Sequence, residues 1–215
     1  MKILVLSDIH SRKESLEKLL SEAGKKEIDL VIAAGDLTNF GGQAETEKII
    51  EKIKKLNKKI FAIPGNLDTK ESILFLEKEG ISIHSKKEKY NEFTFIGFGG
   101  ATDCMGEIIF TEKELYESLK ELMQETGKEK VFLITHSPPK NSLLDKNVSG
   151  KHIGSDAIRK IITEFEPEFS VSGHCHESFG KEKIGKTTCI NPGAVKENRA
   201  ALIDTKTKKT EFMKI

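Results

Sequence analysis

The sequence predicts one α/β domain, residues 1–215, with a partly parallel sheet. Short apolar runs alternate with longer segments whose apolar residues recur at helical spacing. From Lys181 on, the pattern changes to short antiparallel strands with turns, which indicates a second sheet or an extension of the first. No repeat and no low-complexity linker divides the chain, and 215 residues suit one large domain.

The strands are predicted from short runs rich in Val, Ile, Leu and Phe. A strand that is buried on both faces appears in the sequence as a continuous apolar run. In chain order, these runs cover residues 2–7, 28–34, 59–64, 92–100, 130–135 and 168–173, and the tail adds strands that include 186–191 and 199–204.

The helices are predicted from apolar stripes and from end signals. The first covers 11–24, where Ser11 and Glu14 fit a capping box and Gly24 ends the apolar stripe. The later helices are expected around Ile49, Ile50, Ile53 and Leu56, after Asp68, from Thr111 with Glu114, and from Ser155 as a cap.

The composition narrows the functional class. A formal net charge of +1 provides no general attraction for nucleic acid, and only three of the 35 basic residues are arginines. No apolar run approaches the roughly 20 residues needed to cross a bilayer, and the N-terminus reaches Asp8 too early for a signal peptide. Three scattered cysteines do not make a disulfide framework. We therefore expect a cytoplasmic protein with a small-molecule substrate and no membrane or nucleic-acid partner; the oligomeric state is not indicated.

Polar side chains follow five of the predicted strands, just past the carboxyl end of each. In α/β sheets this edge is where ligands bind. Carboxylate and imidazole groups are ligands for Mn, Fe, Zn and similar divalent ions. The residues are Asp8, His10, Asp36, Asn66, His136, His174 and His176.

Each of these residues has an ordinary alternative role. A single Asp or Asn after a strand usually caps a helix or forms a turn. The His174–His176 pair, taken alone, suits two surface histidines; in an extended strand both rings would point to one place. Capping does not explain the repeated histidines, nor the glycines before Asp36, Asn66 and His174, which allow a crowded backbone. Seven ligands exceed one tetrahedral zinc site and suit two ions that share a carboxylate.

The ordered motifs resemble those of the calcineurin-like metallophosphoesterases, from residue 8 to about residue 194. A later segment, NPGA (191–194), is similar to one in the small prokaryotic phosphodiesterase branch. The resemblance implies a four-layer αββα sandwich of two mixed β-sheets flanked by helices. The matching motifs are DIH (8–10), GD (35–36), GN (65–66), THSPP (135–139) and GHCH (173–176).

The resemblance also implies two divalent ions, with manganese as the first choice and iron, zinc, nickel or cobalt as alternatives. His174 and His176 would then bind neighbouring ions, in contrast to the simple alternation argument. Asp36 would bridge the ions and, with Asn66, take part in catalysis; Asn66 would also contact the substrate. One ion would be held by Asp8, His10, Asp36 and His176, and the other by Asp36, Asn66, His136 and His174.

The activity implied by the resemblance is hydrolysis of phosphodiester bonds in small substrates, nucleotide-like ones among them. A hydroxide held between the two ions would attack phosphorus. A phosphomonoesterase, a nuclease and a noncatalytic metal-binding scaffold are the alternatives, and the fold alone does not choose among them.

One position departs from the family pattern. The family usually has Gly-Asn-His, but here Leu67 takes the place of the histidine, which assists protonation of the leaving group. A leucine side chain has no proton to donate. His152, just before a predicted helix N-terminus, is a candidate catalytic and substrate-binding residue that could supply the acid. A structural or surface role for His152 is the alternative.

Four further features carry weaker expectations. Asp68 is expected to cap the following helix or, as an alternative, to orient a ligand. His84 has no motif partner and is expected at the surface. Cys175 is expected to point away from the metals and to pack. The loop 38–42 is expected to form a turn or to line the pocket.

Overall fold

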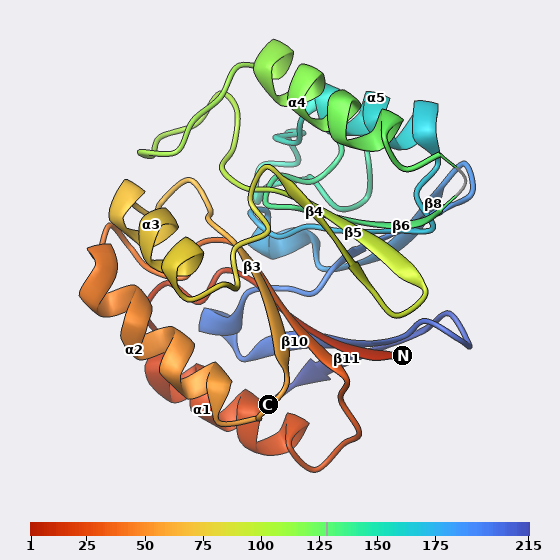
Figure 1. Ribbon diagram of the computed structural model, residues 1–215. Helices are drawn as coiled ribbons and strands as arrows, with labels where there is room; N and C mark the ends of the chain where they lie inside the picture. The colour runs from red at the N-terminus through yellow and green to blue at the C-terminus, as the bar shows by residue number, and fades with distance from the viewer. Residues whose placement is uncertain (128) are drawn as a thin grey trace.

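The computed structural model describes residues 1–127 and 129–215, and these form four layers (Figure 1). Two sheets lie face to face in the middle, and helices cover their outer faces. This arrangement confirms the predicted fold class. None of the helices in the described ranges is long and apolar enough to cross a membrane. The first sheet is covered by α1 (Lys13–Ala23), α2 (Gly42–Lys54) and α3 (Lys70–Lys78), and the second by α4 (Glu112–Gln124) and α5 (Asp156–Phe165).

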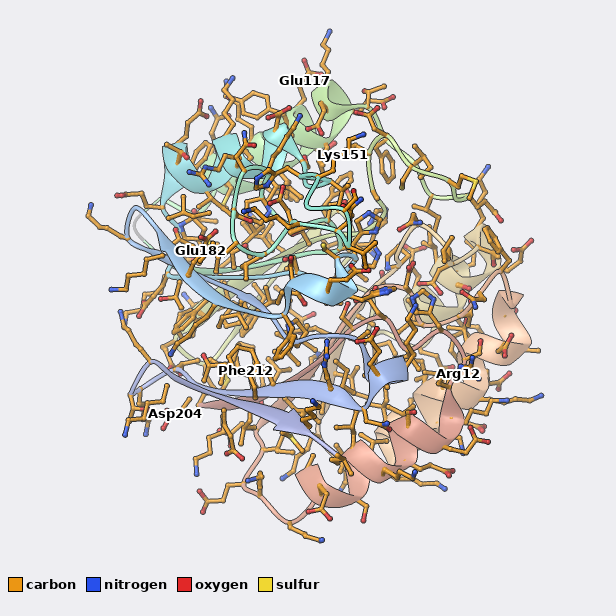
Figure 2. The ribbon with its side chains drawn as sticks, turned by 180° about the vertical axis from the view of Figure 1, so that it is seen from behind. Arg12, Glu117, Lys151, Glu182, Asp204 and Phe212 are labelled. Atoms are coloured by element: carbon orange, nitrogen blue, oxygen red, sulfur yellow. The ribbon has the colours of Figure 1, made fainter. Side chains whose placement is uncertain are left out.

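The first sheet is mixed and has the strand order β11-β10-β1-β2-β3. The strands β1, β2 and β3 run parallel, while β10 and β11 add an antiparallel edge. Asp204 and Phe212, labelled in Figure 2, lie on this edge. The strands are β1 (Lys2–Leu6), β2 (Leu30–Ala34), β3 (Lys59–Ile63), β10 (Arg199–Asp204) and β11 (Lys209–Lys214).

The second sheet is also mixed, with the order β4-β5-β6-β7-β9-β8. Its four central strands run parallel, and an antiparallel strand closes each edge. The strands are β4 (Lys86–Tyr90), β5 (Phe93–Phe98), β6 (Lys130–Thr135), β7 (Phe169–Val171), β8 (Gly180–Ile184) and β9 (Thr187–Asn191), and two short 3₁₀ turns, η1 (His176–Ser178) and η2 (Val195–Glu197), follow β7 and β9.

The apolar core explains why the strands appear as continuous apolar runs. In β1, Ile3 and Val5 belong to the cluster between the two sheets, whereas Leu4 and Leu6 belong to the cluster under the helices. Successive side chains of a strand point to opposite faces, so a strand between two apolar layers needs apolar residues at every position. A third cluster fills the space between the second sheet and its helices.

The predicted helix starts are confirmed at two sites and wrong at a third. Thr111 and Glu114 form a reciprocal capping box at α4, and the Ser155 hydroxyl accepts from the backbone of α5. The predicted capping box of Ser11 with Glu14 does not form, because α1 begins at Lys13 without a side-chain cap. Ser11 instead has φ 62° and donates its N–H to Leu37 O, so it belongs to the loop that follows β1.

Both sequence-based alternatives for the tail are confirmed in part, because its strands are shared between the two sheets. The β8–β9 pair extends the second sheet, and the β10–β11 pair extends the first. The edge strand β4 was not expected, since its sequence KKEKY lacks an apolar pattern. Among the described residues, its backbone pairs with β5 alone, and charged side chains protect its open side.

The expectation that His84 is a surface residue is wrong. Its ring is half-buried and packs against Phe98 and Phe110, with centroid distances of 5.1 and 6.0 Å. The Nδ1 atom accepts a hydrogen bond from Gly99 N at 2.9 Å, which requires Nδ1 to be unprotonated. Burial lowers the pKa of His84 to about 4.

This shift predicts that His84 makes stability depend on pH. Because its folded pKa lies below the unfolded value, its contribution is complete above about pH 6.5 and is lost as pH falls through about pH 4. The loss reaches about 3 kcal/mol at the acid limit. In His84→Asn, whose amide oxygen can still accept from Gly99 N, denaturant unfolding of metal-stripped protein should show a smaller loss between pH 7 and 4.5 than in the wild type. Equal losses in both proteins would rule out this role.

Candidate metal centre

The structure gathers all seven candidate ligands at one edge of the two sheets. The carboxyl ends of three parallel strands in the first sheet and two in the second meet there. This meeting of strand ends is what the sequence pattern indicated. Asp8 and His10 follow β1, Asp36 follows β2, Asn66 follows β3, His136 follows β6, and His174 and His176 follow β7.

The backbone at this edge is bent into an unusual conformation. Asp8, His10, Asp36 and His174 have φ angles of 54°, 47°, 50° and 64°. Left-handed backbone is costly for residues with a side chain, and such residues concentrate at functional sites. The loops are held by cross-strand hydrogen bonds, among them Asp8 N to Gly35 O and His10 N to Asp36 O, both 3.0 Å.

The glycines that precede Asp36, Asn66 and His174 have the role expected of them. At Gly35, Gly65 and Gly173, a Cβ atom would overlap side chains of the site. The backbone therefore approaches the polar cluster more closely than any other residue would permit.

The first half of the site consists of Asp8, His10 and His176, whose ligand atoms lie within 4.8 Å of one another. His176 Nε2 lies 3.1 Å from Asp8 Oδ1 and 3.2 Å from His10 Nε2. His10 Nδ1 donates to Asn39 Oδ1 at 2.8 Å, which leaves Nε2 with a lone pair. Two ring nitrogens this close need a proton or a cation between them.

The second half contains Asp36, Asn66, His136 and His174. His136 Nδ1 donates to Ala34 O at 2.9 Å, so Nε2 faces inward, 3.1 Å from Asn66 Oδ1 and 3.5 Å from Asp36 Oδ2. Asn66 directs its oxygen to this point because its Nδ2 donates to Met105 O at 2.8 Å. The His174 ring lies against His136, with a centroid distance of 5.2 Å.

Asp36 lies between the two halves. Its Oδ2 atom is 3.8 Å from His10 Nε2 and 3.5 Å from His136 Nε2, and its Oδ1 accepts from Leu67 N at 2.9 Å. Asp8 also contacts both sides, because its carboxylate accepts from His174 N at 3.0 Å and belongs to both groups of close ligand atoms. Two buried carboxylates thus stand between four imidazoles.

The two histidines after β7 do not point to one place, so the alternation argument is wrong for them. The strand ends at Val171, before either histidine. His174 has left-handed backbone, whereas His176 begins the turn η1. Their rings therefore lie against His136 and His10 respectively, in different halves of the site.

Burial and charge set the protonation of the cluster. Burial raises the pKa of Asp36, but the charge of His136 and the N–H of Leu67 outweigh burial and hold that pKa below its usual range. Burial lowers the pKa of His136, yet the Asp36 and Asp8 carboxylates raise it to about 9. For His174, burial and the charge of His136 lower the pKa to about 4. A cation bound at His136 Nε2 would therefore displace a proton.

The donor set fits divalent cations. With its Nδ1–H committed to Ala34, neutral His136 presents an acceptor at Nε2, and Asn66 Oδ1 and Asp36 Oδ2 are acceptors too. Three converging acceptors repel one another unless a positive charge lies among them. Imidazole nitrogen with carboxylate and amide oxygen suits Mn, Fe, Zn and related ions.

Some supporting residues had little or no signal in the sequence. Asn39, which orients His10, comes from the loop 38–42, for which a turn or a pocket wall was expected. The Met105 carbonyl, which orients Asn66, comes from a loop that carries no motif. In metal sites, partners of this kind fix the direction of a ligand ring or amide.

Asp68 has a different role from the helix cap that was expected. Thr69 caps α3, in a reciprocal box with Ser72. The buried Asp68 carboxylate instead accepts from Thr38 N and Gly65 N, both at 2.8 Å, and so joins the loops after β2 and β3. Burial and the nearby Asp36 raise the pKa of Asp68 to about 6.

The other two singled-out residues lie beside the ligand groups. Cys175 is buried and its thiol donates to Lys146 O at 2.9 Å, as the packing prediction implied. His152 is half-buried, and with His174 it lines a cavity of about 460 Å³. The loop that carries His152 runs into α5; its neighbour Lys151 is labelled in Figure 2.

Known proteins are similar to this chain, in sequence or in fold, over most of its length. An uncharacterized protein of Methanocaldococcus jannaschii is 35% identical over 203 residues, which cover 89% of this chain and 88% of that protein. A probable glycerophosphodiester phosphodiesterase of Arcobacter nitrofigilis is 25% identical over 162 residues, covering 71% of this chain and 58% of that protein. The crystal structure of a Thermus thermophilus protein superposes with a TM-score of 0.81 at 16% identity, covering 99% and 98% of the two chains.

The family assignment comes from the sequence itself. Residues 1–178 match the family described as calcineurin-like phosphoesterase, and this range includes all seven residues of the cluster. The order of the motifs, the two mixed sheets and the position of the polar cluster agree with that match. The chain therefore belongs to the calcineurin-like phosphoesterase family.

Proposed function

We propose that this protein hydrolyses small phosphodiesters with two divalent metal ions. The observation that carries the proposal is the position of Asp36, whose Oδ2 lies within 3.8 Å of imidazole nitrogens in both halves of the cluster. When bound, two ions would supply an activated water near neutral pH and positive charge against the phosphoryl oxygens. Manganese is the ion that we propose first, since three of the seven ligands are oxygen donors.

Some of these residues would bind the two ions, and others would orient the residues that bind them. Asp8, His10 and His176 would hold one ion, with Asp36 as a shared ligand. Asn66, His136 and His174 would hold the other. Asn39, Ala34 and Met105 fix the ligand directions before substrate arrives, so little reorganisation accompanies the reaction. Asn66 would also contact the substrate phosphate.

Diesters are proposed ahead of monoesters for an electrostatic reason. A diester carries less negative charge than a monoester, and Leu67 supplies no cation where the family usually has histidine. The name of the Arcobacter nitrofigilis relative, a probable glycerophosphodiester phosphodiesterase, supports the same preference. Phosphomonoester hydrolysis remains a second candidate, because Lys140 and Lys151 line the cavity beside His174 and would suit a dianion.

An apolar rim beside Asn66 supports substrates with a flat organic group, such as a nucleoside or an aryl ester. Phe40 is 56% exposed and Met105 is 88% exposed. Phe40 N donates to Leu67 O at 2.8 Å, and Met105 O accepts from Asn66, so both residues adjoin the metal cluster. Phe40 also has φ 56°, a strained conformation that places an aromatic ring in solvent.

The proposal is tested by turnover of chelator-stripped protein with a series of added metals. Bis(p-nitrophenyl) phosphate and p-nitrophenyl phosphate are matched diester and monoester substrates with one leaving group. We expect no turnover without metal, recovery that saturates at two ions per chain, and faster hydrolysis of the diester. Full activity with one bound ion, or without any, would refute the two-metal proposal.

Leu67→His is expected to change substrate preference rather than to improve all reactions. The new imidazole can donate a proton and carry charge, so hydrolysis of alkyl phosphomonoesters should rise relative to nitrophenyl diesters, by up to about 10²-fold. Leu67→Asn is the matched control, because it is polar but is not a general acid. The preference is measured as the ratio of kcat/KM for alkyl phosphomonoesters to kcat/KM for nitrophenyl diesters in each variant. If Leu67→Asn shifts the preference as much as Leu67→His, acid catalysis is not the cause.

A further inference from the structure

A hydrogen-bonded pair of polar side chains, His152 and Asp145, lies next to the seven candidate metal ligands. His152 Nδ1 lies 2.6 Å from Asp145 Oδ1, and the Asp145 side chain is fully buried. Backbone N–H groups of Asn141, Ser142 and Gly154 donate to the same carboxylate at 3.0, 3.0 and 3.2 Å. The Ser142 hydroxyl also donates at 3.4 Å, so with His152 five donors surround the carboxylate and fix it as the acceptor for the Nδ1–H of His152.

The His152 side chain faces the same cavity as His174, a candidate metal ligand. His152 and His174 both line the cavity of about 460 Å³, and the side chain of His152 is 32% exposed. The backbone at Gly154 approaches the pair closely, because a Cβ there would lie 2.7 Å from Pro138 O and 2.9 Å from Asp145 Cβ. A histidine held by a buried carboxylate and open to a cavity has the arrangement of an oriented acid–base group.

We infer that His152 is the general acid of this enzyme and protonates the leaving oxygen, with Asp145 as its positioning residue. The inference rests on the proposed phosphodiester hydrolysis. It is needed because Leu67 offers no proton at the position where the family usually has histidine. The Asp145–His152 pair would provide that proton from another loop.

The step balances without any further reactant. The oxygen of a water molecule forms a bond to phosphorus, and the bond between phosphorus and the leaving oxygen breaks. The electron pair of that bond stays on the leaving oxygen, which takes the proton from Nε2 of the His152 imidazolium. Asp145 stays ionised and holds the ring. The proton that the attacking water releases goes to solvent, and neutral His152 regains a proton from solvent before the next turnover.

The test is the dependence of rate on the leaving group, measured in His152→Gln holoenzyme. Methyl aryl phosphates and dialkyl phosphates form a series of diesters with leaving groups of increasing pKa. We expect the variant to lose less than about tenfold with nitrophenolate and about 10²–10⁴-fold with alkoxide leaving groups. Its metal content should stay at the wild-type value. His84→Asn, which changes another half-buried histidine, should retain wild-type rates throughout.

Two results would overturn the inference. The first is a loss in His152→Gln that is the same for every leaving group, which would indicate a structural role only. The second is full activity of His152→Gln toward alkyl esters. A wild-type protein that hydrolyses none of the diesters would instead refute the proposed function, and the inference with it. Asp145→Asn gives a further check, since a mispositioned ring should lower kcat more than it raises KM and should again affect alkyl esters most.

Discussion

Asp36→Asn should reduce the bound metal from two ions to at most one and lower diester hydrolysis by at least about 10³-fold. The Asp36 carboxylate is buried and faces imidazoles of both halves, so its negative charge acts on both positions. An amide has nearly the same shape, but it has no charge and only one oxygen. Charge stabilisation by a bound ion is worth several kcal/mol, and each 1.36 kcal/mol corresponds to tenfold in rate.

Elemental analysis after dialysis measures the bound metal, and steady-state kinetics with one diester substrate measure the loss of hydrolysis. Asp204→Asn is the matched control, because Asp204 lies on β10 opposite Lys2, at the other end of β1 from the cluster. The control should keep two ions and the wild-type rate. If Asp36→Asn also retains both ions and full activity, the bridging role of Asp36 is wrong.

The double variant His174→Ala, His176→Ala should lose both ions. Each substitution removes a nitrogen donor from a different half, since the two rings lie against His136 and His10 respectively. The substitutions should leave the fold intact, because both residues follow the end of β7 and neither belongs to the hydrophobic clusters. We expect metal affinity to fall by at least about 10²-fold, more than the 10–100-fold typical of losing an outer partner of a ligand.

Metal titration against a competing chelator separates the two sites. His176→Ala alone should weaken one binding step and His174→Ala alone the other, while the double variant weakens both. His84→Asn serves as the histidine control and should titrate like the wild type. Normal metal content in the double variant would show that these residues are not ligands.

Local patterns were sufficient for most of the fold. Strands and helices depend on residues a few positions apart, so the apolar runs and the capping signals at Thr111 and Ser155 identified most of them; the charged edge strand β4 was missed. The same reasoning failed at Ser11, where a loop bent toward the cluster overrides the capping signal. It also failed at His84, because nothing local indicates that Gly99 N will meet the ring.

The sequence by itself determined which side chains arrive at the site, since Asp, Asn and His follow five apolar strands in order. Only the tertiary structure decided which neighbours they meet. His10 and His176 are 166 positions apart and come from different sheets, so their 3.2 Å approach depends on how the sheets pack. The division of His174 from His176, the support from Asn39 and the Asp145–His152 pair follow from loop conformations. His174 and Asn39 depend on hydrogen bonds between residues far apart in the chain, whereas the Asp145–His152 pair depends on bonds between residues three to nine positions apart within one irregular loop. No short sequence pattern predicts either kind of network.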